Sequence, residues 1–193
     1  MLRRSLLLVR ALIKAALCDD VVVDIQGNAV LSGADYYMML PFEGPDGGEF
    51  APGKTSNMTC PLSVVLDPAS GGELVRISST SAKKGIVSTE EAVDVSFANK
   101  IKCAESSKWM IVRERGEDFW SVVISSARDH PGSEILSGSF KIQKSNVMGG
   151  YKFIFCPNAT VCGNIQGSDR LVLIFGSDSA FNFVLRPKAS LGS

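Results

Sequence analysis

Residues 109–125 read WMIVRERGEDFWSVVIS, a pattern that points to an all-β fold. Two runs of β-branched and aromatic residues, Trp109–Arg113 and Trp120–Ser125, flank a charged segment that contains Gly116. Runs of this kind are typical of strands, and glycine and acidic residues between them are typical of turns. We therefore predict two short strands joined by a turn.

The same alternation of short runs and turn residues extends in both directions along the chain. No stretch of the body sustains a helical period long enough to predict a helix. Regularly spaced short strands are typical of a sandwich or a barrel. About twelve strands in one domain suit a pseudo-three-fold arrangement of four-stranded units, although no repeat is visible in the sequence itself. The other predicted strands are Val21–Ile25, Tyr36–Leu40, Leu62–Leu66, Leu74–Ser78, Val93–Phe97, Phe140–Gln143, Tyr151–Phe155, Leu171–Phe175 and Phe181–Leu185, with a weaker one at Glu49–Ala51.

Length and charge set the broad class of protein. A chain of 193 residues with 45% hydrophobic content suits one ordinary domain with a sizeable core. The formal net charge is zero, but four basic residues precede the first acidic residue, Asp19. Without residues 1–18, 16 basic and 20 acidic residues remain, a net charge of −4. Such a body lacks the basic surface that nucleic acids and anionic membranes require, so we predict neither as a partner.

The first eighteen residues, MLRRSLLLVRALIKAALC, differ in composition from the rest. Their basic start and Leu/Val-rich run are typical of a secretory signal, but Arg10 and Lys14 interrupt the apolar region. An amphipathic organelle-targeting peptide and a misassigned gene start remain as alternatives, and the run is too short and too charged to span a bilayer. We favour a degenerate signal, because the cysteines fit an oxidising compartment. This predicts a leader at 1–18, a single domain at 19–193, and a secreted or vacuolar protein.

The cysteines and sequons support that route. Cys18 ends the leader, which leaves four cysteines in the body, and four cysteines allow three pairings. None of them forms a Cys-x-x-Cys pair for zinc or redox chemistry. Two sequons, Asn57-Met58-Thr59 and Asn158-Ala159-Thr160, make Asn57 and Asn158 candidate glycosylation sites in an exported chain. The four body cysteines are Cys60, Cys103, Cys156 and Cys162.

One segment matches a nucleotide-binding pattern and is rejected. Residues 48–55, GEFAPGKT, fit G-x-x-x-x-G-K-[ST]. That chemistry needs a strand before the loop and a helix after it, so that backbone N–H groups face phosphate. Here a Gly/Pro turn precedes the segment, and a loop followed by a strand comes after it. We interpret residues 48–55 as a turn.

Candidate catalytic residues are few. A serine or cysteine nucleophile needs a base, and His130 is the single histidine. It lies in the turn sequence Asp-His-Pro-Gly, so we expect an exposed loop histidine. Neither tryptophan, Trp109 or Trp120, follows the Gln-x-Trp pattern of sugar-binding trefoils, and we expect both in the core. The sequence therefore predicts no enzyme, no catalytic residue, no metal and no cofactor.

Eight segments, in order along the body, resemble the Kunitz soybean trypsin inhibitor family, which includes the miraculin-like proteins. The opening, VDIQGNAV at residues 23–30 followed by GADYY at 33–37, resembles the family's V-x-D-x-x-G-N signature and the aromatic strand after it. Each segment alone is weak, but their common register is specific. The later segments are Cys60–Val65, Ser107–Trp109, Phe140–Ile142, Tyr151–Pro157, Cys162–Ile165, Arg170–Leu173 and Phe183–Leu185.

The resemblance implies a β-trefoil of about twelve strands, in agreement with the strand pattern. It also implies the disulfides Cys60–Cys103 and Cys156–Cys162, which the cysteine count alone leaves open. In the chain-entropy treatment the first stabilises by about 4 kcal/mol and the second by about 2 kcal/mol. Asn158 then lies inside the shorter disulfide loop.

The resemblance further implies a protease as partner. Inhibitory members present one exposed loop that enters the active site as a substrate does. Counting forward from Ile77 gives Ala82 as the primary specificity residue, whereas counting back from Phe97 gives Lys83. We favour Lys83, then Lys84, because an exposed lysine fits the acid-lined pocket of a trypsin-like enzyme. The whole candidate loop is Ser79, Thr80, Ser81, Ala82, Lys83, Lys84, Gly85 and Ile86.

Two positions depart from the inhibitory pattern. Ser32 stands where many inhibitors have an asparagine that hydrogen-bonds the loop from behind, and a hydroxyl makes fewer bonds than an amide. Thr80 stands near the loop's start, where many members have proline. Both changes predict a more mobile loop. The alternatives are therefore a solvated loop without a function, an inhibitor of cysteine or aspartic proteases, and a non-inhibitory storage or miraculin-like protein. The sequence contains no signal for oligomeric state.

Overall fold

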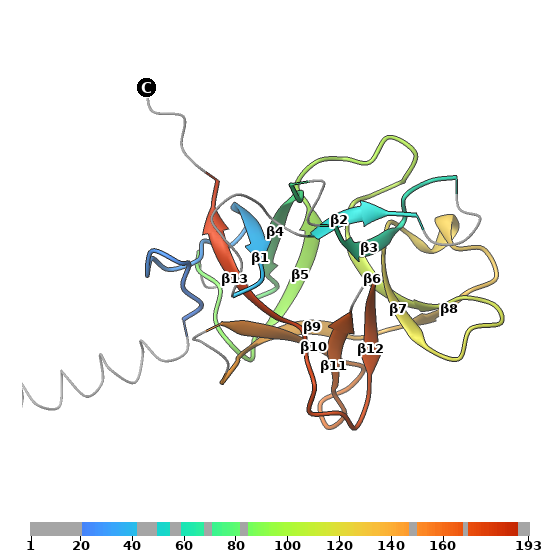
Figure 1. The fold of residues 1–193 in the computed structure, drawn as a ribbon. Coiled ribbons are helices and arrows are strands. Elements are labelled where there is room, and N and C mark those ends of the chain that lie inside the picture. The colour runs from blue at the N-terminus through green and yellow to red at the C-terminus, as the bar shows by residue number, and fades with distance from the viewer. Residues whose placement is uncertain are drawn as a thin grey trace, which may run out of the picture.

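The computed structural model describes residues 21–41, 50–54, 59–67, 71–81, 85–146, 150–167 and 170–188. These residues form thirteen strands in one continuous sheet and one short 3₁₀ turn, η2 (Ala127–Asp129), so the all-β prediction is confirmed (Figure 1). The strands are β1 (Asp35–Met39), β2 (Phe50–Gly53), β3 (Ser63–Leu66), β4 (Leu74–Ser79), β5 (Ala92–Phe97), β6 (Trp109–Arg113), β7 (Trp120–Ile124), β8 (Glu134–Leu136), β9 (Ser139–Lys144), β10 (Tyr151–Cys156), β11 (Gly163–Gly167), β12 (Leu171–Ile174) and β13 (Asn182–Pro187).

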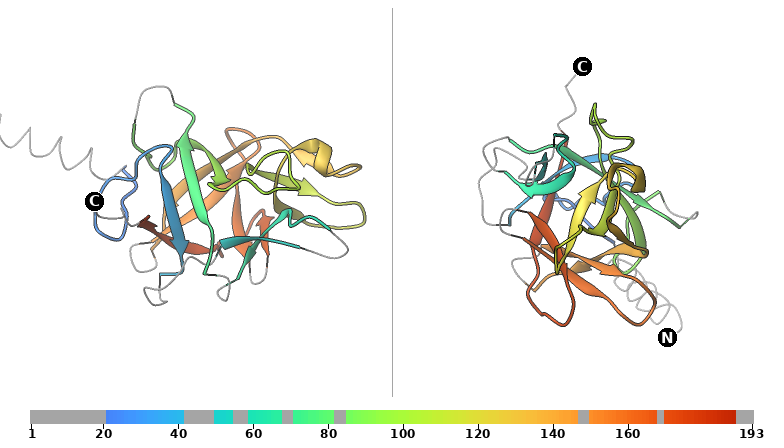
Figure 2. Two further views of the ribbon diagram at one scale, coloured as in Figure 1. Left: turned by 90° about the horizontal axis from the view of Figure 1, so that it is seen from above. Right: turned by 90° about the vertical axis from the view of Figure 1, so that its right-hand side faces the viewer.

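Six strands close into a ring. Each pairs antiparallel with the next in the order β1, β4, β5, β9, β10 and β13, and β13 pairs with β1 again. Three hairpins, β2–β3, β6–β7 and β11–β12, cap one end of this barrel, where β7 pairs with both β3 and β12. In Figure 1 all three lie to the right of β1, β4 and β5, with β11–β12 below the other two hairpins; Figure 2 shows the fold from two further sides.

This arrangement is a β-trefoil. Each of its three units contributes a ring strand, a cap hairpin and a second ring strand: β1–β4, then β5, β6, β7 and β9, then β10–β13. The thirteenth strand is β8, a three-residue strand that pairs with β6 alone among the described strands. The trefoil's twelve strands and β8 make thirteen, whereas the twelve strands predicted from the sequence included Val21–Ile25 and missed both β8 and β11.

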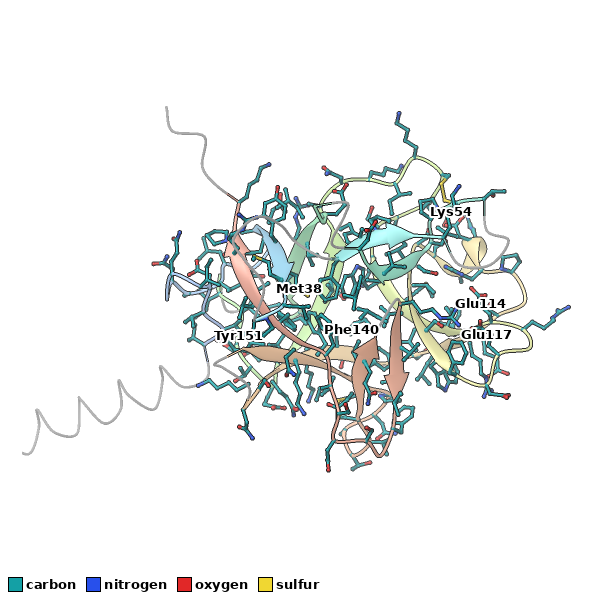
Figure 3. The ribbon with its side chains drawn as sticks, viewed as in Figure 1. Met38, Lys54, Glu114, Glu117, Phe140 and Tyr151 are labelled. Carbon is teal, nitrogen blue, oxygen red and sulfur yellow. A yellow bond between two sulfur atoms is a disulfide. The ribbon has the colours of Figure 1, made fainter. Side chains whose placement is uncertain are left out.

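The core fills the barrel and lies beneath the cap. Met38 and Phe140, labelled in Figure 3, are 0% and 4% exposed and belong to one continuous cluster of buried residues. Trp109 is buried as expected and lies within 6.4 Å, between ring centroids, of the Phe97 and Phe140 rings. Trp120 packs against the cluster from its edge, partly buried. Ring strands such as β5 and β9 alternate buried and more exposed side chains, as a sheet that packs one face on a core requires.

Two disulfides link the chain at separate places. Cys60–Cys103 joins residues 43 apart and Cys156–Cys162 joins residues 6 apart, the pairing that the family resemblance implies. The longer link ties the loop before β3 to the loop before β6. The shorter one closes the connection between β10 and β11.

The strand prediction for Val21–Ile25 is wrong. Val21 and Val23 make isolated bridges, and the first regular strand begins at Asp35. The cause is Asp24, whose carboxylate Oδ1 accepts hydrogen bonds of 2.9 Å from the backbone N–H groups of Gln26 and Asn28. These bonds turn the chain at Gly27, where φ is +81°.

The interpretation of residues 48–55 as a turn is also wrong in its described part, whereas the weaker strand predicted at Glu49–Ala51 is confirmed at Phe50 and Ala51. Phe50–Gly53 form β2, which pairs with β3 along its full length. The glycine that completed the nucleotide-binding pattern has a packing role, because a Cβ on Gly53 would lie 2.4 Å from Cγ1 of Val65. Similar crowding explains why β11 is hidden in the sequence. A Cβ on Gly163 would lie 2.7 Å from Cδ1 of Leu173, so close strand packing selects a residue with low strand propensity.

Candidate functional site

The candidate loop rises from the end of β4 and leads towards β5. The structure describes its first three residues, Ser79–Ser81, and its last two, Gly85 and Ile86. Ala82, Lys83 and Lys84 lie outside the described residues, so the choice between them stays a prediction. The geometry of the site is therefore the geometry of the two flanks that hold these three residues.

Ser32 connects the two flanks. Its hydroxyl Oγ accepts a 2.9 Å hydrogen bond from the backbone N–H of Ser79, and its own N–H donates a 3.0 Å bond to the carbonyl of Gly85. The next residue, Gly33, donates its N–H to the carbonyl of Ile77 at 2.8 Å. One short segment behind the loop thus fixes the separation of its ends. This is the position that sequence reasoning singled out for loop support.

The first flank is also bonded to β5. Both the N–H and the hydroxyl of Thr80 donate to the carbonyl of Ala92, each at 3.0 Å. Ser79 Oγ accepts a 3.2 Å bond from the N–H of Ser81. Thr80 lacks the fixed φ of a proline, but its hydroxyl supplies a second bond to the same carbonyl. The mobility predicted from this substitution is offset on this side of the loop.

The second flank is anchored in the core. Val87 donates its N–H to the carbonyl of Val30 at 2.8 Å, and its carbonyl accepts a 3.0 Å bond from the N–H of Val22. All three valines are 0% exposed. Ile86 forms a bridge with Leu31, directly beside them. A few residues after its tip, the loop therefore becomes part of the packed interior.

An apolar outer face adjoins this flank. Val23 pairs with Ala29, and the N–H of Val30 donates to the carbonyl of Val22, so residues 21–31 form a narrow ribbon. Because side chains alternate across a ribbon, its inward valines leave Val23 and Leu31 facing outward. Val23 is 36% exposed and Leu31 is 53% exposed. We call Val23, Ile25 and Leu31 the apolar rim; Ile25, on the same ribbon, is 52% exposed.

Sequence reasoning missed the backbone contacts of the site. The carbonyls of Ala92 and Val30 hold the flanks, and no side-chain pattern marks them, because every residue carries a carbonyl. The apolar rim did leave a signal. In VVVDIQGNAVL, apolar residues occupy both faces of the ribbon, whereas a half-buried ribbon usually alternates with polar residues.

His130 is buried, and the expectation of an exposed loop histidine is wrong. It is 4% exposed, and its Nε2 lies 3.1 Å from the carbonyl oxygen of Ile124. The η2 turn causes this, because Ser126 caps its N-terminal end and His130 caps its C-terminal end, next to β7. The ring nitrogen therefore satisfies a strand carbonyl, and we assign His130 a structural role.

An adjacent network holds the loop between Cys103 and Trp109. Asp129 and the hydroxyl of Ser125 form a hydrogen bond, and both accept from the N–H of Glu105 at 3.0 Å. The Ser125 hydroxyl, followed by the N–H of Glu105, lowers the pKa of Asp129 below its ordinary value of 3.8. Ser125 has φ of +104°, a strained conformation for a residue with a Cβ. These interactions stabilise the loop before β6 against the end of β7 and have no catalytic arrangement.

Two features are absent from the described part of the chain. There, no three histidine, cysteine or acidic side chains are grouped so that they could hold a metal ion. The same residues include no helix of the length and apolarity needed to cross a membrane. Asn158 is exposed within the Cys156–Cys162 loop, while Asn57 lies outside the described residues.

Fold and site together define a disulfide-linked β-trefoil with a loop between β4 and β5 whose two described flanks are held by hydrogen bonds. The chain belongs to the Kunitz family described as "trypsin and protease inhibitor", whose model matches residues 22–186. It is 34% identical over 164 residues to a subtilisin inhibitor of Canavalia lineata, covering 80% of this chain and 86% of that protein. It is 38% identical over 144 residues to a Kunitz-type elastase inhibitor of Bauhinia rufa, covering 70% of this chain and 96% of the relative.

A solved structure agrees with these relatives. The crystal structure of a Kunitz-type trypsin inhibitor from Cicer arietinum has a TM-score of 0.78 and 31% sequence identity. The match covers 88% of this chain and 99% of that one. The family consists of protease inhibitors, which bind enzymes and are not themselves enzymes.

Proposed function

We propose that this protein inhibits trypsin-like serine endopeptidases by presenting residues 79–86 to the active site as a substrate-like loop, and that it is not an enzyme. The observation that carries the proposal is the pair of bonds from Ser32 to Ser79 and Gly85. A segment bound from behind at both ends keeps its outer side available for a partner.

Restraint of the loop is what separates an inhibitor from a substrate. A free peptide loses conformational entropy when it enters a protease, whereas a loop held on a rigid scaffold has already lost most of it. The two flanks of the loop also stay in place on the scaffold when a peptide bond of the loop between them is cut. Cleavage then releases no fragment, and the intact bond can form again within the complex.

Lys83 supports the trypsin-like class of target. An ammonium group that enters an acid-lined pocket forms a desolvated charge pair at the centre of the interface, where binding energy is concentrated. The names of the relatives include inhibitors of subtilisin, elastase and trypsin, so the scaffold accommodates different specificity residues. In this chain the lysines at positions 83 and 84 favour trypsin among these.

We propose further that the protein is exported through the secretory pathway. Two disulfides and a leader-like segment at residues 1–18 support this route. A tagged full-length chain expressed in plant cells should be found in the vacuole or the extracellular space. Retention in the cytosol with reduced cysteines would contradict export.

The test of function is titration of trypsin, elastase and subtilisin with the oxidised protein. We expect stoichiometric inhibition of trypsin with a constant between about nanomolar and about micromolar, and weaker inhibition of the other two. Folded protein that leaves all three enzymes active would overturn the serine-protease proposal. Cysteine and aspartic proteases would then be titrated, and inactivity against both would leave a non-inhibitory role.

A further inference from the structure

The connection between β10 and β11 is a small exposed loop that the inhibitory site does not use. Cys156 and Cys162 close it, and all five residues from Asn158 to Cys162 are exposed. The loop is a hairpin connection fixed at its base by a covalent bond. Its exposed residues are free of the packing demands that act on the strands on either side.

The Asn158 side chain is held in one orientation within this loop. Its Oδ1 accepts three hydrogen bonds of 3.0 Å, from the N–H and the hydroxyl of Thr160 and from the N–H of Val161. Because two of these donors are backbone N–H groups, the amide can have its oxygen on this side only. Its nitrogen, Nδ2, therefore faces away from the turn, and among the described residues no group accepts a hydrogen bond from it.

We propose that Asn158 is an acceptor for N-linked glycan. The sequence Asn158-Ala159-Thr160 is a sequon, and the structure presents its amide nitrogen and its threonine on the same exposed turn. The co-reactant is an oligosaccharide linked to a lipid diphosphate. Nδ2 forms a bond to C1 of the first sugar while the C1–O bond to the diphosphate breaks. The lipid diphosphate leaves with that electron pair, and Nδ2 loses one proton to a base of the transferase.

The surroundings accommodate a large substituent. A glycan is bulky and hydrophilic and requires a site where no buried surface is displaced. Asn158 lies beyond the end of β10, and the neighbouring Val161 is 46% exposed. The turn survives modification because its three hydrogen bonds end on Oδ1, which remains an acceptor when Nδ2 is substituted.

A purely structural role for Asn158 makes a different prediction. Aspartate accepts the same three hydrogen bonds through a carboxylate oxygen but has no nitrogen for a sugar. Asn158→Asp therefore keeps the turn and removes the acceptor. Thr160→Ser keeps the sequon, whereas Thr160→Val keeps the size of the side chain and removes the hydroxyl that the sequon requires. These three variants separate the turn from the modification.

The experiment uses the full chain, expressed in plant cells with a cleavable secretory signal added before Met1 so that entry into the lumen does not depend on residues 1–18. Exported protein is digested with trypsin, with and without prior treatment by an N-glycan amidase. The peptide Phe153–Arg170 contains Asn158, and the separate peptide Thr55–Arg76 contains Asn57.

We expect a mass increase on Phe153–Arg170 in the wild type and in Thr160→Ser, removed by the amidase with conversion of Asn158 to aspartate. Asn158→Asp and Thr160→Val should lack it, and Asn158→Asp should unfold at the same denaturant concentration as amidase-treated wild type. Exported wild-type protein with closed disulfides and an unmodified Asn158 would overturn the proposal. Inhibition of trypsin is not part of this test, so its outcome is independent of the proposed function.

Discussion

The N–H of Ser79 donates a 2.9 Å hydrogen bond to Oγ of Ser32, a residue 47 positions earlier in the chain. Ser32 itself donates to Gly85, so a single residue links the start and the end of the candidate loop. The loop's restraint is therefore long-range in sequence. A substitution at Ser32 tests it without altering any residue that enters a protease.

Ser32→Ala should weaken inhibition by about fivefold, because one net hydrogen bond contributes about 1 kcal/mol. The same variant should be cleaved faster between residues 79 and 86, because the first flank is less restrained. Inhibition constants and the rate of loop cleavage measure both effects. Ser32→Asn is the matched control, since its longer amide can bond both flanks. Equal cleavage rates for wild type and Ser32→Ala would show that Ser32 does not restrain the loop.

Lys83→Ala should reduce trypsin inhibition by about thirtyfold or more, because truncation of a central charged residue typically costs at least about 2 kcal/mol. Lys84→Ala should change the constant by less than about threefold, because a charge at the edge of an interface contributes little. The two variants differ by one position and by no other property. A large loss in Lys84→Ala with none in Lys83→Ala would shift the specificity residue by one.

Leu31→Asp should weaken trypsin inhibition by about tenfold or more, because a leucine buried at an interface contributes about 1.5–3 kcal/mol. Leu31 belongs to the apolar rim and is bridged to Ile86 at the end of the loop. Ile135→Asp is the control: Ile135 is 43% exposed and lies on β8, at the far side of Figure 1 from β1. Unchanged inhibition in Leu31→Asp would exclude the apolar rim from the interface.

Replacing the two cysteines of one disulfide by serine should lower the free energy of unfolding more for the longer disulfide than for the shorter one. Opening the 43-residue link between Cys60 and Cys103 removes about 4 kcal/mol, and opening the 6-residue link between Cys156 and Cys162 about 2 kcal/mol. The free energies of unfolding from denaturant titration give both values. Equal losses would mean that entropy of loop closure does not control the contribution of these bonds.

The stabilising contribution of the Asp129 carboxylate should be lost in acid. Its pKa is lowered in the folded state, mainly by the Ser125 hydroxyl, so folding favours the carboxylate. This contribution is complete above the unfolded pKa and is lost as the pH falls through the folded pKa. Asp129→Asn should therefore cost a few tenths of a kcal/mol at neutral pH, since solvent screens the carboxylate.

The deficit of Asp129→Asn should shrink as the pH falls through the folded pKa of Asp129, because the wild-type carboxyl then becomes protonated as well. Thermal unfolding of both proteins across the acid range measures this. A wild-type stability that falls no faster with acid than that of Asp129→Asn would show that the charge of Asp129 does not contribute.

Much of the fold was predictable because its signals are local. Runs such as Trp109–Arg113 and Tyr151–Phe155 carry strand propensity and became β6 and β10 with nearly the predicted bounds. The failures come from tertiary contacts. Asp24 turns the β-branched run at residues 21–25 because its carboxylate accepts hydrogen bonds from nearby backbone N–H groups. In β11, Leu173 leaves no room for a side chain at position 163, so the strand has a glycine there, which carries no strand signal.

Less of the candidate site than of the fold could be predicted from the sequence. Ser32 was located through the family resemblance, since a lone serine between Leu31 and Gly33 has no property that marks it as a loop support. The carbonyl of Ala92 could not be predicted, because it depends on which strand lies beside Thr80. His130 was misjudged because its sequence context describes a turn correctly and contains no information on what the turn packs against.

The closed ring of six strands also affects how resistant the protein is to proteolysis. A protease binds its substrate in extended form, as an added strand, and an unpaired sheet edge offers such a strand. Within the described residues, β1, β4, β5, β9, β10 and β13 are each paired on both sides, and β2 and β8, with four and three residues, are short. Among the described strands, the barrel therefore leaves little unpaired backbone that a protease could bind as an added strand, and we expect cleavage to be confined to the loops.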